Sequence, residues 1–241
     1  MKPIFILLPL LAFFQTNTQE MSANEIINAS IKKHGGDKYQ NAHYAYDFRK
    51  HHYEYHYVEG TFRYERHSKD GKTKDILTNN GFKRTEDGKD VELTEKKVRG
   101  FSNSVNSVHY FAFLPSFLND DAVNKKRVGE STILGKDYYK VEVTFNQEGG
   151  GDDHDDVYMY WINKTDFTMD YLAYSFHVNG GGVRFRSAYN PRRVGGIIFQ
   201  DYVNYKAAVG TPLADLPKLF EQDELKELSL IETENVVELK N

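Results

Sequence analysis

The stretch HYAYDFRKHHYEYHYVEGTFRYE, residues 43–65, decides the fold of this chain. Aromatic residues alternate with other residues along it, first on one parity, then on the other, then on the first again: Tyr44, Tyr46 and Phe48; Tyr53, Tyr55 and Tyr57; Phe62 and Tyr64. A period of two is the repeat of a half-buried β-strand, and aromatic side chains suit its pleated surface. The phase slips at residues 49–52 and at Gly60, where we expect turns.

Hairpin signals continue this pattern toward the middle of the chain. Asp70-Gly71, Asn80-Gly81 and Asp87-Gly88 are dipeptides favoured in two-residue hairpin loops, because their residues tolerate positive φ. Residues 43–90 are therefore predicted to form a meander of sequential antiparallel strands.

Two helices flank this meander. The first is predicted to begin at Ser22, whose hydroxyl can cap it while Glu25 reaches back, and to stop at Gly35-Gly36. The second covers residues 94–114, with apolar residues at three- and four-residue spacing. Phe111 and its neighbours add more apolar surface than a one-sided helix needs. This helix is therefore either buried deeper in the core or lines a ligand cavity.

The second half of the chain repeats the strand pattern. We expect strands at residues 139–145, 157–162, 167–178, 183–188 and 197–206, then a third helix from Leu213 to Leu228 and a last strand from Ile231 to Leu239. Meandering strands with a few helices must bury their apolar face on those helices. The predicted fold class is α+β, mainly β: one curved antiparallel sheet, a half-open barrel, wrapped around the helices.

The N-terminus has the pattern of a secretory signal peptide. Lys2 precedes Pro3–Phe14, a stretch without charge, and a polar segment follows. This apolar stretch is about eight residues too short to span a bilayer as a helix. We therefore expect residues 1–20 to be a removed signal peptide, with an uncleaved membrane anchor or a buried first strand as the alternative. Residues 21–241 are predicted to be a single β-rich domain, exported to the periplasm or outside the cell, with no stable transmembrane anchor after signal removal.

The cysteine content and the net charge limit which covalent links, metal sites and partners the chain can have. The chain has no cysteine, which excludes a disulfide, a thiolate metal site and the lipid-bearing cysteine of a bacterial lipoprotein. The formal net charge of −4 is small for 241 residues, so no broad basic face is indicated. Nucleic acid is therefore not an expected partner.

Several motifs carry a resemblance to known proteins. They are Lys33-His34-Gly35-Gly36-Asp37, Tyr160-Trp161-Ile162-Asn163-Lys164, Asp170-Tyr171-Leu172-Ala173-Tyr174, Gly180-Gly181-Gly182-Val183-Arg184-Phe185-Arg186 and Ala188-Tyr189-Asn190-Pro191-Arg192. The run from Tyr158 to Tyr205 is similar to an exported Bacteroidota family of unknown function (DUF6503-like). The capped helix followed by a strand meander resembles the LolA-like class of lipoprotein carriers. The resemblance to these carriers implies a fold only, and neither likeness brings an activity with it.

No recognised catalytic signature is present. The sequence lacks a G-x-S-x-G elbow, an H-E-x-x-H zinc helix and a dinucleotide fingerprint. An enzymatic role would have to use polar residues of the 152–192 region, with His177 or His154 as the base. No cofactor is expected.

Two clusters contain metal-ligand residue types. The acidic loop Asp152-Asp153-His154-Asp155-Asp156 matches no calcium-loop spacing and is interpreted as a solvated turn. His52, Glu54 and His56 share one strand face, but neighbouring strands would have to complete any site. We therefore predict no metal site.

The candidate ligand-binding residues surround a glycine-rich turn. They are His177, Asn179, Arg184, Arg186, Asn190 and Arg192. Arginine forks bind carboxylate or phosphate, and glycines let a ligand approach the backbone. Pairing of these arginines with Asp170, Asp201 or the acidic loop on a solvated face is the alternative.

The predicted function is that of a non-catalytic binding module for a lipid or another apolar or amphiphilic molecule. An envelope hydrolase or lyase is the alternative. If Arg184 and Arg186 face the cavity, a carboxylate or a bound anion must satisfy them. If Val183 and Phe185 take the core instead, we expect both arginines on the outer surface.

Overall fold

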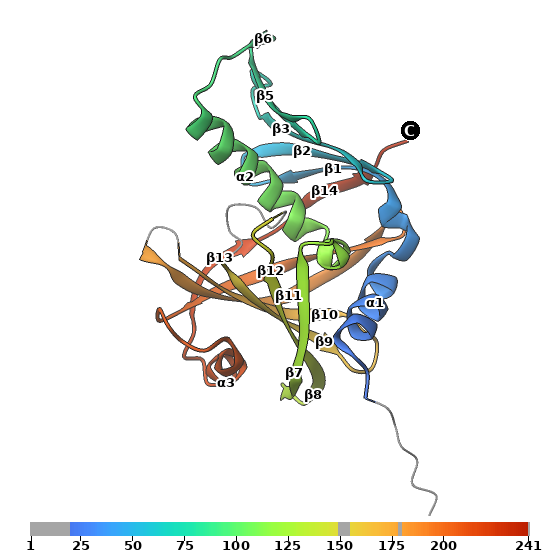
Figure 1. Ribbon diagram of the computed structural model, residues 1–241, viewed down its shortest axis with the longest axis vertical. Helices are drawn as coiled ribbons and strands as arrows, with labels where there is room; N and C mark the ends of the chain where they lie inside the picture. The colour runs from blue at the N-terminus through green and yellow to red at the C-terminus, as the bar shows by residue number, and fades with distance from the viewer. Residues whose placement is uncertain (1–19, 149–154, 178–179, 241) are drawn as a thin grey trace, which may run out of the picture.

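The strands form two separate sheets, each with seven antiparallel strands, in a computed structural model that describes residues 20–148, 155–177 and 180–240 (Figure 1). The strand order of the first sheet is β14-β1-β2-β3-β4-β5-β6, and that of the second is β13-β12-β11-β10-β9-β8-β7. The strands of the first sheet are β1 Asn41–Phe48, β2 His51–Val58, β3 Thr61–Ser68, β4 Thr73–Thr78, β5 Gly81–Glu86, β6 Lys89–Asp90 and β14 Glu234–Glu238. Those of the second are β7 Val123–Ile133, β8 Lys136–Phe145, β9 Val157–Asn163, β10 Met169–Phe176, β11 Gly182–Val194, β12 Ile197–Ala207 and β13 Lys226–Ile231.

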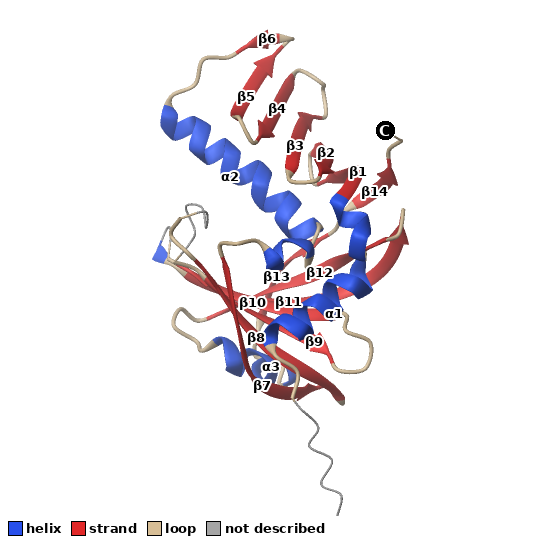
Figure 2. Cartoon of the chain, turned by 45° about the vertical axis from the view of Figure 1, so that its right-hand side comes forward, coloured by secondary structure: helices blue, strands red, loops and turns tan. Residues whose placement is uncertain are grey.

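The helices lie between the sheets and outside the second one. They are α1 Ala23–His34, α2 Glu95–Ala112 and α3 Leu216–Glu221, with short 3-10 turns η1 Gly36–Gln40, η2 Ser116–Asn119 and η4 Leu213–Asp215. The predicted start of α1 is confirmed: Ser22 accepts from the Glu25 backbone, and the Glu25 carboxylate accepts from the Ser22 backbone 2.8 Å away. Figure 2 shows α2 running between the two sheets. The predicted position of α2 is confirmed to within about two residues at each end.

The expectation of one curved sheet is wrong, although the mainly β, antiparallel class is correct. The chain leaves the first sheet after β6, passes through α2 and starts a new sheet at β7. It returns only at its end, where β14 pairs with β1 through Tyr44 and Glu238 and through Ala45 and Val237. Hairpin spacing reports which consecutive strands pair. It carries no information on whether strands before and after a helix share a sheet.

The region after residue 212 also differs from the sequence-based expectation. The third helix ends at Glu221, and β13 starts at Lys226 inside the predicted helix. The predicted last strand is divided between the two sheets, because β13 pairs with β12 while β14 pairs with β1. Leu228 and Leu230 alternate with polar residues on β13, which is the strand signal that competes with the helical spacing.

Three apolar clusters hold these layers together. Tyrosines on the inner face of the first sheet pack on Val105 of α2 and on Phe113, the residue directly after this helix. The inner face of the second sheet packs on α1, with Ile26 and Ile27 both fully buried. The outer face of the second sheet is covered by η4 and α3, so both faces of that sheet are buried in its middle strands.

In the described part of the chain, no helix combines the length and the apolar character needed to cross a membrane.

Candidate functional site

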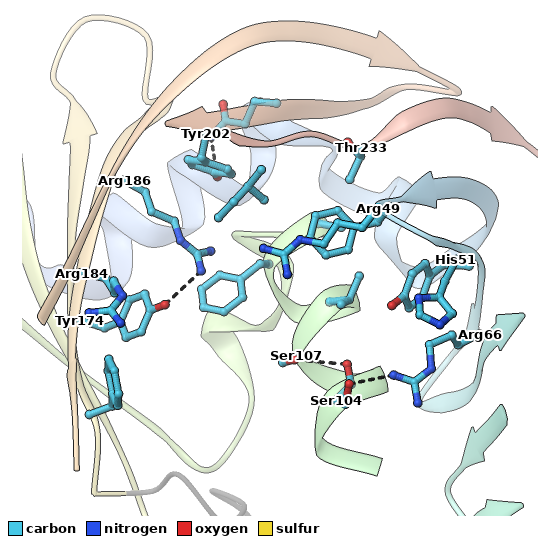
Figure 3. A pocket seen from close by; sticks show the side chains of 18 of the residues that line it. Arg49, His51, Arg66, Ser104, Ser107, Tyr174, Arg184, Arg186, Tyr202 and Thr233 are labelled. Carbon is cyan, nitrogen blue, oxygen red and sulfur yellow. Dashed lines mark hydrogen bonds between the residues drawn. The ribbon is translucent and has the colours of Figure 1, made fainter. Parts of the chain in front are cut away.

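A cavity of about 670 Å³ opens between the two sheets, beside α2 (Figure 3). Its walls come from α2, from the β1–β2 hairpin with neighbouring β3, and from β9 to β12 with the end of β13. This volume lies within the range of small-molecule pockets. The cavity is therefore large enough for a ligand of moderate size.

One face of α2 forms the helical wall of the cavity. Ser104, Ser107, Val108, Phe111 and Ala112 line it, at positions i, i+3, i+4, i+7 and i+8. Residues with this spacing lie on one side of an α-helix. The cavity-lining interpretation of this helix is thus consistent with the structure.

A neighbouring face of α2 is buried against the first sheet. Val105 and His109 are fully buried, and the ring of His109 packs against those of Tyr46, Tyr53 and Tyr64. Both interpretations of the excess apolar surface therefore apply, because the helix lies between a core and a cavity.

The second sheet supplies the opposite wall. Tyr174 of β10 pairs in register with Arg184 of β11, and Arg186 follows two residues later on the same face. Gln200 and Tyr202 continue this wall on β12. The two arginines and the tyrosines therefore face the same space as the helical wall, as Figure 3 shows.

Arg186 lies deepest among these cations. It is 7% exposed, its Cζ lies 3.9 Å from the centre of the Phe111 ring, and its Nη2 donates to the Tyr174 hydroxyl at 3.1 Å. Its Nε and Nη1 have no hydrogen-bond partner in the described part of the chain. Arg184 is less buried; its Nη1 donates to the Val183 carbonyl.

The expectation that burial of Val183 and Phe185 would expose the arginines is wrong. Val183 is 2% exposed and Phe185 is fully buried, yet the intervening arginines line the cavity. The reason is the outer cover: the Phe185 ring lies 5.3 Å from that of Phe220 on α3. A strand buried on both faces does not separate a core side from a solvent side.

None of the other described residues among the predicted site residues lines the cavity. His177 is exposed and is not among the cavity-lining residues, and Asn179 falls outside the described residues. His154, the other candidate base, also lies outside the described residues, together with Asp152 and Asp153.

Asn190 and Arg192 belong to a polar network at the far end of β11. Arg192 lies 3.1 Å from the Asp201 carboxylate, and Asn190 donates to that carboxylate at 2.7 Å. Arg192 also donates to the Thr233 carbonyl and, at 2.7 Å, to its hydroxyl. The predicted pairing alternative therefore describes Arg192, which joins β11 to the segment between β13 and β14.

The first sheet contributes basic side chains that were not among the predicted site residues. Arg49, Lys50, His51 and Arg66 line the cavity opposite the arginines of β11. The signal was the basic run Arg49-Lys50-His51-His52, which we interpreted only as a turn. Burial, followed by the charge of Arg66, lowers the pKa of His51 and favours its neutral form.

Arg66 is held by a carboxylate of its own sheet. Its Nε donates to Asp75 at 2.9 Å, and Arg84 donates to the same carboxylate at 2.6 Å. Arg66 also donates to the Ser104 hydroxyl at 2.7 Å, and Arg84 stacks 3.6 Å above the Phe101 ring. This group connects the first sheet to α2.

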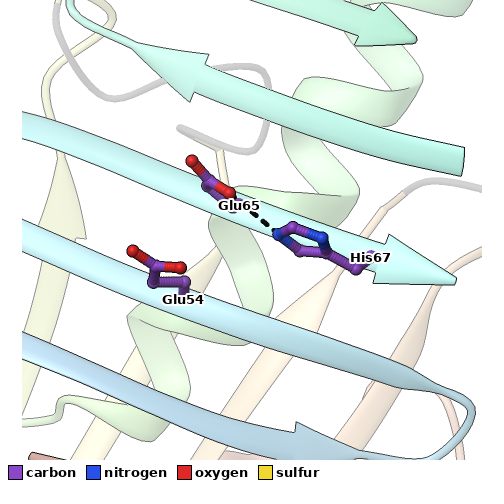
Figure 4. Close-up of side chains that lie close together, drawn as sticks. All are labelled: Glu54, Glu65 and His67. Atoms are coloured by element: carbon purple, nitrogen blue, oxygen red, sulfur yellow. Dashed lines mark hydrogen bonds and ion pairs between the residues drawn. The ribbon is translucent and has the colours of Figure 1, made fainter. Parts of the chain in front are cut away.

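A Glu54–Glu65–His67 cluster is the metal-ligand group found among the described residues (Figure 4). Glu65 accepts from His67 at 2.8 Å and pairs with Lys74 and Arg63, each at 2.6 Å. Burial alone would raise the pKa of Glu65, but these contacts outweigh it and lower the pKa to about 2. Because cations of the protein already surround this carboxylate, we interpret the cluster as an ion-pair network on the outer face of the first sheet.

Comparisons with known proteins identify the fold and the family. A search of curated protein sequences gives no match. The structure resembles a LolA superfamily protein from Nitrosomonas europaea, with a TM-score of 0.54 and 10% identity over 92% of this chain and 95% of that chain. It also resembles a putative outer membrane lipoprotein-sorting protein domain from Vibrio parahaemolyticus, with a TM-score of 0.46 and 7% identity over 91% and 94% of the two chains. The TM-score of 0.54 to the Nitrosomonas europaea protein shows a LolA-like fold. The sequence profile of the family of unknown function DUF6503 matches residues 2–233, so the chain belongs to this family.

Proposed function

We propose that this protein is an exported, non-catalytic binding module that holds an apolar or amphiphilic, lipid-like molecule in the cavity between its two sheets. The observation that carries the proposal is the cavity itself, whose volume is about 670 Å³. Aromatic and aliphatic side chains make up about half of its lining residues: Phe48, Tyr53, Val108, Phe111, Ala112, Tyr158, Tyr174, Phe176, Tyr202 and Ile231. Apolar walls with a few placed polar groups are typical of small-molecule sites.

The LolA-like fold supports the proposal as a scaffold, because in this chain it leaves the cavity between the two sheets, beside α2. Export is proposed from the charged start and the short apolar stretch before residue 20. The alternative of a hydrolase or lyase receives no support from His177, which is exposed and does not line the cavity.

Native mass spectrometry of the protein purified from its own host tests the proposal. We expect a co-purifying amphiphile that gentle activation releases. Ser107→Trp places an indole at a cavity-lining position of α2 and is expected to reduce the bound fraction.

Asn106→Trp is the matched control, since Asn106 is the exposed neighbour of Ser107 on the same helix and does not line the cavity. It should retain the wild-type bound fraction. Protein that carries no small molecule, and that takes up no alkyl-chain probe after purification, would refute the proposal.

A further inference from the structure

We propose that the ligand of this cavity carries an anionic oxygen group, a carboxylate or a phosphate, that binds the guanidinium of Arg186. This inference rests on the proposed function and specifies the chemical class of the ligand. It makes the ligand an anionic amphiphile, with a charged group at β11 and an apolar part along α2.

Within the described protein, the guanidinium of Arg186 has few hydrogen-bond partners. Arg186 is 7% exposed, and neither its Nε nor its Nη1 has a hydrogen-bond partner in the described part of the chain. The remaining nitrogen, Nη2, donates to the Tyr174 hydroxyl, which is uncharged. Arginine cannot escape this cost by losing its proton, because its pKa is too high. A buried cation with unused donors is unfavourable unless an anion completes it.

Arg186 differs from three other arginines that are buried or partly buried. Arg66 and Arg84 share the carboxylate of Asp75. Arg192, which lies on the same strand as Arg186, pairs with Asp201. The protein thus provides a carboxylate at each of those three arginines. At Arg186 the described residues provide the faces of Phe111 and Tyr174. Aromatic faces attract the charge of a guanidinium but do not accept hydrogen bonds in its plane.

The side chains that line the cavity carry a net positive charge. Arg66 is balanced by Asp75, and the other lining residues still include more cations than anions: Arg49, Lys50, Arg184 and Arg186 against Asp156. Their summed field favours an anion inside the cavity and disfavours a cation.

Apolar side chains of α2 lie beside the guanidinium of Arg186. Phe111 covers the guanidinium of Arg186, and Val108 and Ala112 continue the same helix face beside it. Bidentate hydrogen bonding to a planar fork suits carboxylate and phosphate oxygens. The geometry therefore places a polar head and an apolar chain next to each other.

The experiment compares ligands that share an alkyl chain and differ in the head group. Dodecanoate, dodecyl phosphate, dodecanol and dodecyltrimethylammonium are titrated below their micelle concentrations into delipidated mature protein by calorimetry. Acetate and inorganic phosphate are titrated as head groups without a chain. We expect the two anionic amphiphiles to bind at least about tenfold more tightly than dodecanol, and the cation to bind most weakly.

Arg186→Gln is expected to weaken dodecanoate binding by about tenfold or more while changing dodecanol binding by less than about twofold. Arg193→Gln is the matched control, because Arg193 lies on the same strand, is exposed and does not line the cavity. Because the change removes an unpaired buried charge, Arg186→Gln should also raise the melting temperature of the ligand-free protein. Arg186→Lys retains a charge without the planar fork and serves as a second variant, which should show an intermediate loss.

The outcomes separate the inference from the proposed function. Equal binding of dodecanoate and dodecanol, unchanged in Arg186→Gln, would overturn the anion site and leave the lipid-like cavity in place. Acetate or phosphate binding as tightly as the alkyl ligands would overturn the lipid-like proposal and leave an anion site. Absence of binding by every probe would overturn both.

Discussion

The side chains of Arg66 and Asp75 face each other across β3 and β4, and the Arg66 Nη2 lies 2.5 Å from the Asp75 carboxylate. Asp75 is 1% exposed, so this carboxylate is a buried charge with two guanidinium partners, Arg66 and Arg84. Because Arg66 also contacts Ser104 of α2, the pair links the first sheet to the helix that lines the cavity.

Replacing Asp75 by Asn should reduce the free energy of unfolding by about 3–5 kcal/mol, because the buried guanidinium of Arg66 and the partly buried one of Arg84 lose their shared counterion. Chemical denaturation of the mature protein measures this. Asp90→Asn is the control, since Asp90 pairs with Lys83 on the exposed edge of the same sheet. It should change stability by less than about 1 kcal/mol. Equal effects of the two changes would contradict the assigned role of Asp75.

The stability of the protein should fall as the pH drops from about 6.5 toward 4, because two buried histidines are neutral in the folded state. Burial, as the largest cause, lowers the pKa of His34 to about 4 and that of His109 to about 3. Both histidines bind a proton more readily in the unfolded chain, so the unfolded state gains protons first as the pH falls. Their contribution is complete above the unfolded pKa of about 6.5 and decreases below it. At pH 5 the loss amounts to about 2 kcal/mol for each histidine.

Denaturant titrations at pH 7, 6 and 5 measure this dependence. The His34→Gln, His109→Gln double variant should show a flatter profile between pH 6.5 and 5, whatever its stability at pH 7. His56→Gln, on the outer face of β2, should keep the wild-type slope. A double variant with an unchanged slope would assign the pH dependence to other groups.

The outer cover of the second sheet should matter for stability and not for the ligand. Leu216 on α3 is fully buried in the cluster around Phe185, on the side opposite the cavity. Leu216→Ala should cost about 2–5 kcal/mol of unfolding free energy and leave dodecanoate affinity unchanged. Leu134→Ala, at a leucine that is 63% exposed, should have little effect on either quantity. A change in affinity for Leu216→Ala would show that the two faces of the sheet are coupled.

The mature protein should begin between Gln15 and Met21. The cap of α1 at Ser22 requires no upstream residue. The described contacts before Ser22 are those of the Arg127 guanidinium with the Glu20 carboxylate at 2.8 Å and with the Met21 carbonyl at 3.2 Å. Intact mass and N-terminal peptide mass of the protein recovered from its host locate the first residue. Recovery of peptides that begin at Met1 in the exported fraction would contradict this prediction.

Local signals in the sequence predicted local structure well. The Ser22–Glu25 box, the glycine hairpins and the spacing of α2 each specify a conformation through nearby atoms, and the structure has each of them. The pairing of β14 with β1 has no such local signal, since the two strands are brought together only by the packing of the whole chain. This is why one sheet was expected where two exist.

In the candidate site, too, the sequence predicts local features but not contacts between distant parts of the chain. Alternation placed Arg184 and Arg186 on one face of a strand, but their exposure depended on α3, which residues 183–188 do not specify. Arg192 is also an arginine of β11, but it follows a shift in the strand register after Tyr189 and pairs with Asp201. Which arginine has a counterion is a property of the neighbours in space. The sequence contains no pattern that reports it.

The pairing of β14 with β1 also sets an order of events during synthesis. Asp47 and Asn235 are hydrogen-bonded at 2.8 Å although they are 188 positions apart. Because a chain is made from its N-terminus, β1 and β2 emerge well before β14, the partner for the other edge of β1. Until then a row of backbone N–H and C=O groups on an aromatic-rich strand lies open to pairing with other chains. A nascent chain therefore exposes this edge of β1 until the β14 segment has been made.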